Sequence, residues 1–218
     1  MLVVGFDTAT PAVSVALHDG GKIVASAMTV DARRHGELLA PMLAGVLAEA
    51  GAGRADLTGV AVGVGPGPYT GLRVGLVTAR VLGAVLGIPV YGVCTLDIIA
   101  AEAALSGEFL VATDARRKEV YWARYNAAGT GADGPMVGPA AEIEGARDLP
   151  VAGDGGSMYA AAFGEVVPPA YPDARTLCTV VTRRLQHQPG PELLAPDPLY
   201  LRRPDAREPG APKKVTPL

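Results

Sequence analysis

The stretch Val60–Gly87, VAVGVGPGPYTGLRVGLVTARVLGAVLG, decides how the rest of the chain must fold. It predicts an apolar strand, a loop of alternating glycine and proline, and a long helix whose only charged residues are Arg73 and Arg80. A loop between a strand and the amino end of a helix often binds phosphate, because backbone N–H groups point at it. Here no lysine follows Gly71, as a phosphate-binding loop would require, and the two prolines have no N–H to donate. The sequence therefore favours a stiff structural turn over a phosphate site.

The helix after this turn has two apolar or small faces at helical spacing. One face comprises Leu72, Leu76, Ala79, Gly83 and Leu86, and the other comprises Gly71, Gly75, Thr78, Leu82 and Val85. One face can cover a sheet, but the second needs another cover, since a helix that is apolar on most sides is normally buried on most sides. Each glycine costs about 1 kcal/mol relative to alanine, so something must need close access to the backbone. We expect another helix there, either His35–Ala50 of the same chain or a helix of a second protein.

Strand patterns on either side of this stretch predict two lobes. An antiparallel meander is expected over Leu2–Phe6, Ala12–His18 and Lys22–Met28. The first strand ends at Asp7 and a later apolar strand ends at Asp114, and in both cases a hairpin follows with the same spacing. The alternative is that two short hairpins resemble each other by chance. The repeat predicts an N-terminal lobe over 1–106 and a C-terminal lobe over 107–204. The dense prolines at the end of the chain predict a disordered tail over 205–218.

Composition and charge narrow the class of protein. With 49% hydrophobic and 19% charged residues, and without an apolar run of about 18 residues, the chain is typical of a globular protein with no membrane span. Met1 runs directly into a strand pattern without a basic leader, so we expect a cytoplasmic protein. Cys94 and Cys178 fit no metal-ligand spacing, which predicts reduced buried thiols and no metal site. The net charge of −3 predicts that any RNA is held mainly by a partner.

Two aspartates raise the alternative of a nucleotide site. If a pseudo-twofold axis relates the lobes, Asp7 and Asp114 face each other across a cleft, as in enzymes that hold Mg-ATP between duplicated domains. Gly153 and Gly155, in the stretch GDGG, would then let an adenosine pack closely. The simpler interpretation is that each aspartate caps a turn, which leaves no cofactor. We recognise no pair of nucleophile and base, and His35, at a helix start, is read as a solvated or capping residue.

Four segments carry a specific similarity: GFDTATPAVSVAL from Gly5, RRHGELLAPML from Arg33, GVGPGPYTGLRVGLVTARVLG from Gly63 and VATDARRKEVYWARY from Val111. Together they resemble the TsaB family, formerly called YeaZ, over nearly the whole chain up to about Asp205. The resemblance implies an α/β fold with two lobes like those of actin, hexokinase and chaperone ATPases, each a mixed sheet with flanking helices. It also implies a part in making N6-threonylcarbamoyladenosine next to the anticodon of tRNA.

The catalytic paralogue in this pathway, TsaD, carries a His-x-x-x-His metal pair just after the strand that follows the Gly-rich helix. Aligned on Pro89 and Gly92, these positions are Thr95 and Ile99 here. Threonine is a poor metal ligand and isoleucine is none. The resemblance therefore implies a scaffold or activator that is not itself an enzyme.

We expect this chain to pair with a TsaD-like transferase through its helices Arg34–Ala50 and Tyr69–Gly87. The expected interface residues are Leu39, Leu43, Gly71, Gly75, Thr78, Ala79 and Leu82. A TsaE-like ATPase and tRNA would join through that complex, and without the partner the same surface would close a homodimer. The alternative function is an ATP-binding, kinase-like phosphotransferase that uses the Asp7/Asp114 cleft.

Overall fold

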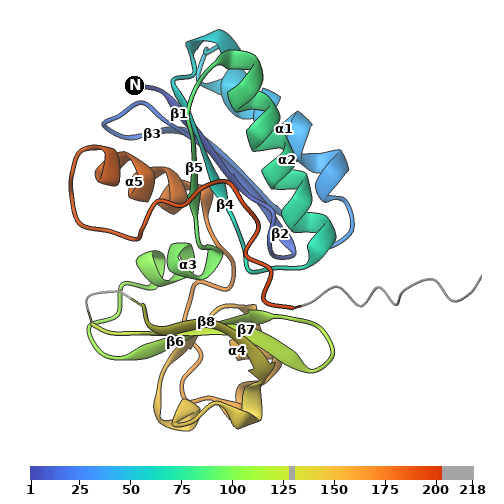
Figure 1. Ribbon diagram of the computed structural model, residues 1–218, viewed down its shortest axis with the longest axis vertical. Coiled ribbons are helices and arrows are strands. Elements are labelled where there is room, and N and C mark those ends of the chain that lie inside the picture. Colours follow the sequence, from blue (N-terminus) through green and yellow to red (C-terminus); the bar gives the residue numbers. More distant parts are fainter. Residues whose placement is uncertain (128–130, 203–218) are drawn as a thin grey trace, which may run out of the picture.

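A computed structural model describes residues 1–127 and 131–202, which form two sheets with flanking helices (Figure 1). The first sheet has the order β3-β2-β1-β4-β5 and comprises β1 (Val3–Asp7), β2 (Ala12–His18), β3 (Ile23–Val30), β4 (Gly59–Gly63) and β5 (Val90–Val93). β1 pairs antiparallel with β2 and parallel with β4, so the sheet is mixed.

The second sheet repeats this opening. It has the order β8-β7-β6-β9 and comprises β6 (Phe109–Asp114), β7 (Glu119–Tyr125), β8 (Gly131–Pro139) and β9 (Val151–Ala152). β6 pairs antiparallel with β7 and parallel with β9, as β1 does with β2 and β4. Asp7 and Asp114 each close the hairpin of their own sheet, opposite Ser14 and Val120. The predicted fold class of two mixed sheets with flanking helices is confirmed.

Helices cover both faces of the first sheet. α1 (His35–Glu49) and α2 (Tyr69–Leu86) lie side by side on one face, and α5 (Ala174–Leu185) lies on the other (Figure 1). The α1/α2 side forms one core cluster with the sheet, which includes Phe6, Val15, Leu39, Val62, Leu72 and Leu76. The α5 side forms another, which includes Val3, Ala61, Ile98, Leu177 and Val181.

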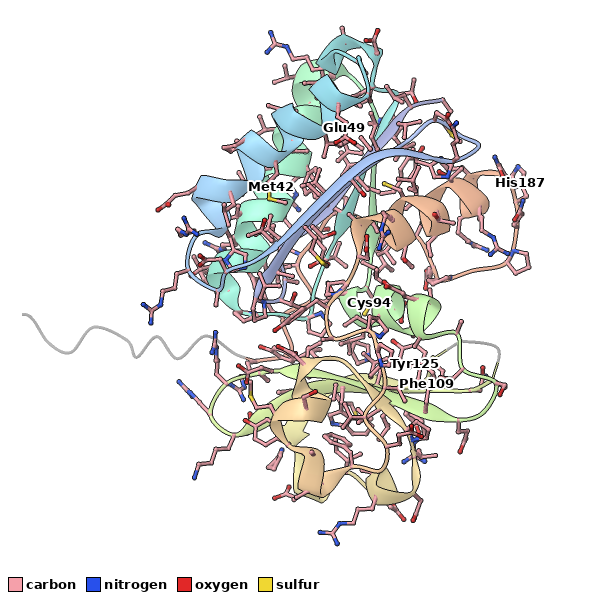
Figure 2. The ribbon with its side chains drawn as sticks, turned by 180° about the vertical axis from the view of Figure 1, so that it is seen from behind. Met42, Glu49, Cys94, Phe109, Tyr125 and His187 are labelled. Carbon is pink, nitrogen blue, oxygen red and sulfur yellow. The ribbon has the colours of Figure 1, made fainter. Side chains whose placement is uncertain are left out.

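α3 (Thr95–Ala103) lies between the two sheets. Its residues Leu96 and Ile99 pack with Phe109 of β6 and Tyr125 of β7, whose rings stack at 5.4 Å (Figure 2). Cys94, just before α3, belongs to this cluster, and both cysteines are buried free thiols as predicted. The far face of the second sheet is covered by shorter elements: α4 (Asp154–Met158) and the 3₁₀ turns Ala140–Glu142, Ala146–Asp148 and Ala160–Ala162. A further 3₁₀ turn, Arg54–Asp56, precedes β4.

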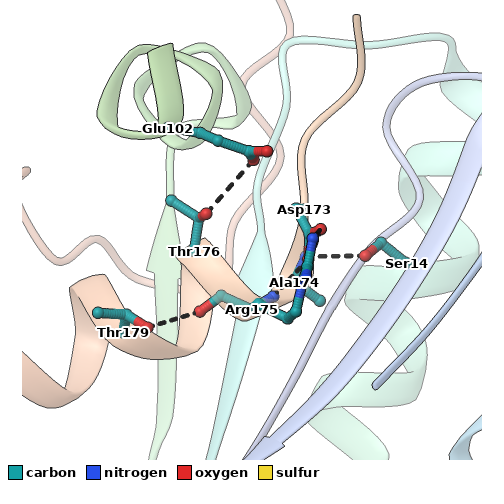
Figure 3. A network of polar contacts seen from close by, with 7 residues as sticks. All are labelled: Ser14, Glu102, Asp173, Ala174, Arg175, Thr176 and Thr179. Carbon is teal, nitrogen blue, oxygen red and sulfur yellow. Dashed lines mark hydrogen bonds and ion pairs between the residues drawn. The ribbon is translucent and has the colours of Figure 1, made fainter. Parts of the chain in front are cut away.

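The predicted C-terminal lobe over 107–204 is corrected for one helix. α5 packs on the first sheet, where the Ala174 N–H donates to Ser14 Oγ at 2.7 Å (Figure 3). Asp173 caps the helix by accepting from the Arg175 N–H at 2.8 Å, and the Thr176 hydroxyl donates to Glu102 of α3 at 3.3 Å. The chain therefore returns to the first lobe after building the second sheet. The tail predicted over 205–218 lies outside the described residues.

Candidate functional site

Asp7 lies at the carboxyl end of β1 and is fully buried. Its Oδ1 accepts a hydrogen bond from the Ala9 N–H at 2.8 Å, and the Thr95 hydroxyl donates to its Oδ2 at 2.8 Å. Gly63 provides the space for this carboxyl group, because a Cβ there would overlap Oδ2. Burial raises the pKa of Asp7 to about 6, against the lowering effect of these two hydrogen bonds. Asp7 thus connects β1 to the start of α3 as a buried structural group.

Asp114 occupies the same place in the second lobe and is also engaged locally. It accepts from the Arg116 N–H at 2.8 Å and forms an ion pair with the Arg116 guanidinium at 3.2 Å. Its own N–H donates to Asp154 Oδ1 at 3.1 Å, and burial, with the nearby Asp114 charge, raises the pKa of Asp154 to about 6. In the described part of the chain, no group of three or more His, Cys, Asp and Glu side chains gathers as a metal site would require.

The two glycines predicted to approach an adenosine lie against the chain itself. Gly153 has φ +98°, and a Cβ on it would overlap the carbonyl oxygen of Ala112 in β6. A Cβ on Gly155 would lie 2.9 Å from the same carbonyl group. Both glycines therefore allow α4 to pack closely on β6, and each of the four predicted nucleotide residues has a structural contact. That no cofactor binds there, with a nucleotide as the alternative, stays a prediction.

The glycine and proline loop is the structural turn that its sequence favours. Gly65 has φ +89°, its N–H donates to Thr95 Oγ1 at 3.1 Å, and its carbonyl accepts from the Thr95 N–H at 2.8 Å. A Cβ on Gly67 would overlap the carbonyl of Ala9. The loop is thus packed between the β1–β2 connection and the start of α3.

A pocket of about 240 Å³ lies where the amino ends of α1 and α2 meet the β6–β7 turn. Its lining includes Thr8, Thr10 and His35 from the first lobe and Arg116 from the second. His35 is buried rather than solvated, and its Nε2 lies 2.8 Å from the Thr10 carbonyl, so this nitrogen carries the proton that is donated. The sequence did not reveal that Arg116 would reach this pocket, because its position depends on how the lobes pack.

The glycines of α2 face the first lobe rather than a partner helix. The Thr8 hydroxyl donates to the Gly71 carbonyl at 2.7 Å and accepts from the Gly75 N–H at 3.0 Å. A Cβ on Gly75 would lie 2.6 Å from that hydroxyl, and one on Gly83 would overlap Val90 of β5. The bare backbone that these glycines provide is therefore occupied by the β1–β2 loop and the sheet.

The predicted partner interface needs a correction for this reason. Five of its seven residues belong to the core of this chain: Leu39, Leu43, Gly71, Gly75 and Ala79. They cannot meet a partner while the sheet covers them. Thr78 and Leu82, at the border of the buried face, are half-buried and stay in the prediction.

A different stripe of α2 is open to solvent. Val77, Val81 and Val85 are 58%, 54% and 75% exposed, and Ala84 beside them is exposed as well. The neighbouring helix α1 continues this surface with exposed small residues, which are Ala40, Pro41, Ala44, Gly45 and Ala48. We call these nine residues the α1/α2 face. By length and composition α2 could also cross a membrane, but its glycine side packs on the sheet of this protein.

The C-terminal segment after α5 borders the α1/α2 face. Leu194 pairs with Gly92 of β5 through two backbone hydrogen bonds of 2.8 Å. Further along, Arg80 of α2 pairs with Asp197, and the Tyr200 ring stacks on Tyr69 at 5.7 Å. The proline content of the C-terminal segment did not indicate that it is ordered, because the contacts that hold the segment join it to residues far away in the sequence.

This chain is similar to known proteins in both sequence and fold. Residues 23–145 match the family model described as TsaD, tRNA N6-adenosine threonylcarbamoyltransferase. A protein named tRNA threonylcarbamoyladenosine biosynthesis protein TsaB, from Escherichia coli, is 38% identical over 128 residues, which cover 57% of this chain and 55% of that protein. A solved structure, YeaZ from Pseudomonas aeruginosa, superposes with a TM-score of 0.76 at 29% identity and covers 92% of this chain and 99% of that one. The chain belongs to the TsaB (YeaZ) family.

Within the TsaB family, similarity extends over the full length to an uncharacterized protein of Mycobacterium tuberculosis. That relative is 46% identical over 209 residues, which cover 94% of this chain and 93% of the relative. A second Pseudomonas aeruginosa structure, described as similar to the peptidase YEAZ, has a TM-score of 0.78 at 29% identity and covers 92% of this chain and 99% of that one. Both lobes are therefore part of the shared fold.

The two positions at which the resemblance led us to look for a histidine pair, Thr95 and Ile99, are core positions. Thr95 is fully buried between Asp7 and the Gly65 N–H, to which its hydroxyl is hydrogen-bonded. Ile99 is fully buried in the cluster around Phe109. Isoleucine offers no donor atom to a metal, and the threonine hydroxyl is already engaged on both sides.

Proposed function

We propose that this chain is a non-catalytic subunit that pairs with a TsaD-like transferase in the synthesis of N6-threonylcarbamoyladenosine on tRNA. The observation that carries the proposal is the exposed α1/α2 face, where three valines of one helix lie open to solvent. Monomeric soluble proteins rarely leave contiguous apolar surface uncovered unless it meets a partner. The family match makes a transferase of the same fold the natural occupant.

The non-catalytic role is supported by the contacts of the residues that could otherwise take part in catalysis. Asp7 and Asp114 are engaged with groups of their own lobes, and Thr95 and Ile99 replace the histidines expected of the transferase. A carboxyl whose pKa is raised to about 6 is also poorly suited to hold a cation, because burial already penalises its charged form. We therefore propose that this chain binds no metal and works without its own nucleotide.

The remaining partners follow from this role. A TsaE-like ATPase joins through the complex with the transferase, and the transferase provides most of the contact with tRNA. The complex works in the cytoplasm. Without the transferase, the same face closes a homodimer, because a twofold interface needs only a self-complementary patch. Sedimentation of the pure chain and of its Val81→Glu variant would measure this self-association.

The test places a charge at the centre of the α1/α2 face. Val81→Glu leaves the fold intact because the side chain is 54% exposed, but it buries an unpaired carboxylate in the complex. Co-purification with a TsaD-like transferase should fall at least about 100-fold, given the cost of roughly 3 kcal/mol or more for such a charge. Met158→Glu is the matched control, because Met158 is equally exposed at 54% but lies in α4 of the second lobe.

Two results would contradict the proposal. The first is a Val81→Glu variant that binds the transferase as tightly as the Met158→Glu control. The second is tight binding of Mg-ATP by the isolated chain, measured by calorimetry and lost in Asp7→Asn, which would favour the phosphotransferase alternative.

A further inference from the structure

Two basic segments that are distant in the sequence reach the pocket between the lobes, and together they carry five basic residues. Arg33 and Arg34 lie just before α1, and Arg116, Arg117 and Lys118 form the turn between β6 and β7. All five are exposed, and Arg33 and Arg116 line the same pocket. We call these five residues the basic rim. Figure 1 shows the amino ends of α1 and α2 at the end of the first lobe that faces the second sheet.

The rim keeps positive charge after its ion pairs are counted. Arg34 pairs with Asp31 at 2.7 Å, and Arg116 pairs with Asp114 at 3.2 Å. In residues 1–127 and 131–202, the side chains of Arg33 and Lys118 form no ion pair. Because the chain as a whole carries −3, this excess is a local feature and not a general property of the surface.

The turn that presents three of these residues is held in an unusual backbone conformation. Arg116, Arg117 and Lys118 have φ values of +63°, +56° and +65°, which non-glycine residues rarely adopt. The Ala115 N–H donates to the Glu119 carbonyl and the Glu119 N–H donates to the Arg116 carbonyl, both at 3.0 Å, and these two bonds close the turn. Arg202 then bonds to the Ala115 carbonyl at 2.9 Å and pairs with Glu119. The basic side chains therefore project from a turn that is fixed to the C-terminal segment.

The interior of the pocket suits an oxyanion. Among the described residues that line it are two arginines, three threonines and the buried His35, and none of them is acidic. The amino ends of α1 and α2, where helix dipoles favour negative charge, also open on it. Its volume of about 240 Å³ is below the roughly 300 Å³ at which sites for whole small-molecule ligands begin. The pocket therefore fits a phosphate group better than an entire nucleotide.

We propose that the basic rim binds the phosphate backbone of the tRNA that the complex modifies, with one phosphate at the pocket mouth. This inference rests on the proposed function, which brings tRNA to the transferase beside this chain. Cations spread along a rim on two lobes match a chain of phosphates, whereas a free nucleotide would need a cavity for its base. This contact adds to the binding of tRNA by the transferase and does not replace it.

The experiment removes charge from the rim without touching its ion pairs. The variant Arg33→Gln/Lys118→Gln changes two exposed side chains, and the control Arg54→Gln/Arg147→Gln removes the same charge at exposed sites elsewhere. The affinity of the complex with a TsaD-like transferase for unmodified tRNA is measured over a series of salt concentrations. The rim variant should bind about 10-fold more weakly at low salt, and its slope of log K against log salt should be shallower by about 1–2, with the control unchanged.

The outcomes separate this inference from the proposed function. If the rim variant pairs with the transferase but binds tRNA with the affinity and salt slope of the control, the inference is overturned and the pairing stands. If the wild-type chain does not pair with the transferase, the proposed function fails, and the same measurement on the chain alone decides the inference. Release of tRNA by millimolar ATP, with no effect of the rim variant on tRNA affinity, would also overturn it, in favour of a nucleotide site.

Discussion

Replacing Asp7 with asparagine should change how the stability of this protein depends on pH. Burial raises the pKa of Asp7 from its ordinary value of 3.8 to about 6. Between these values the folded chain holds a proton at Asp7 that the unfolded chain has lost, so the free energy of unfolding falls as the pH rises. Across the whole window the loss is about 3 kcal/mol, which is complete above the folded pKa.

Asparagine keeps the shape of Asp7 but cannot ionise. Its amide oxygen can accept from the Ala9 N–H as Asp7 does, and its NH₂ group can donate to the Thr95 hydroxyl. We expect the free energy of unfolding of the variant, minus that of the wild type, to increase by roughly 2 kcal/mol from about pH 4 to about pH 7.5. Urea denaturation followed by circular dichroism at several pH values measures this difference directly.

Subtracting the two profiles isolates Asp7, because Asp154, whose pKa is also raised to about 6, contributes equally to both proteins. Asp148→Asn, at an exposed carboxyl group, serves as the control for a change of net charge. Parallel pH profiles for wild type and Asp7→Asn would refute the reasoning, since they would mean that burial does not raise the pKa of Asp7 and that the folded chain carries it ionised well below pH 6. A carboxylate in that state could hold a cation, which would strengthen the nucleotide alternative.

Three further substitutions test the packing around α2 by urea denaturation, with Met158→Ala on the surface as a common control. Leu39→Ala should cost about 2–5 kcal/mol, because the side chain is only 2% exposed between α1 and the sheet, and a cost under about 1 kcal/mol would contradict that packing. Gly75→Leu should cost about 3 kcal/mol or more, since the new side chain meets Thr8, and a stable variant would contradict the role of this glycine. Tyr200→Ala should cost about 1–2 kcal/mol through the lost stack on Tyr69, and an unchanged midpoint would show that the C-terminal segment is not held.

Local patterns in the sequence were sufficient to predict the hairpin that opens each sheet. The alternation in the first strands and the repeated hairpin after Asp7 and Asp114 depend on neighbours a few residues apart, and the structure has both hairpins. The turn at Gly65 was also predictable, because the missing N–H groups of its two prolines are a property of residue type alone.

Contacts between residues that are far apart in the sequence could not be predicted from such local patterns. Helical periodicity identified two faces of α2, but it could not say that the glycine face meets Thr8 and Val90 of the same chain. The predicted interface was placed on that face without Val85, which was assigned to it, and the exposed Val77 and Val81 were not singled out. In the same way, the basic rim forms only because the lobes bring Arg33 and Arg116 to one pocket.

The surroundings of α2 explain why its valine stripe is the part left open to solvent. The glycine face is closed by the β1–β2 loop and the sheet, and the flank that carries Arg73 and Arg80 is closed by the C-terminal segment. α1 lies along the remaining side. Each of these neighbours is fixed by hydrogen bonds or core packing, so α2 cannot rotate to hide its valines. At the start of α3, moreover, the Thr95 hydroxyl donates to the carboxyl group of Asp7. The chain therefore presents a rigid apolar face, as the proposed pairing with a transferase requires.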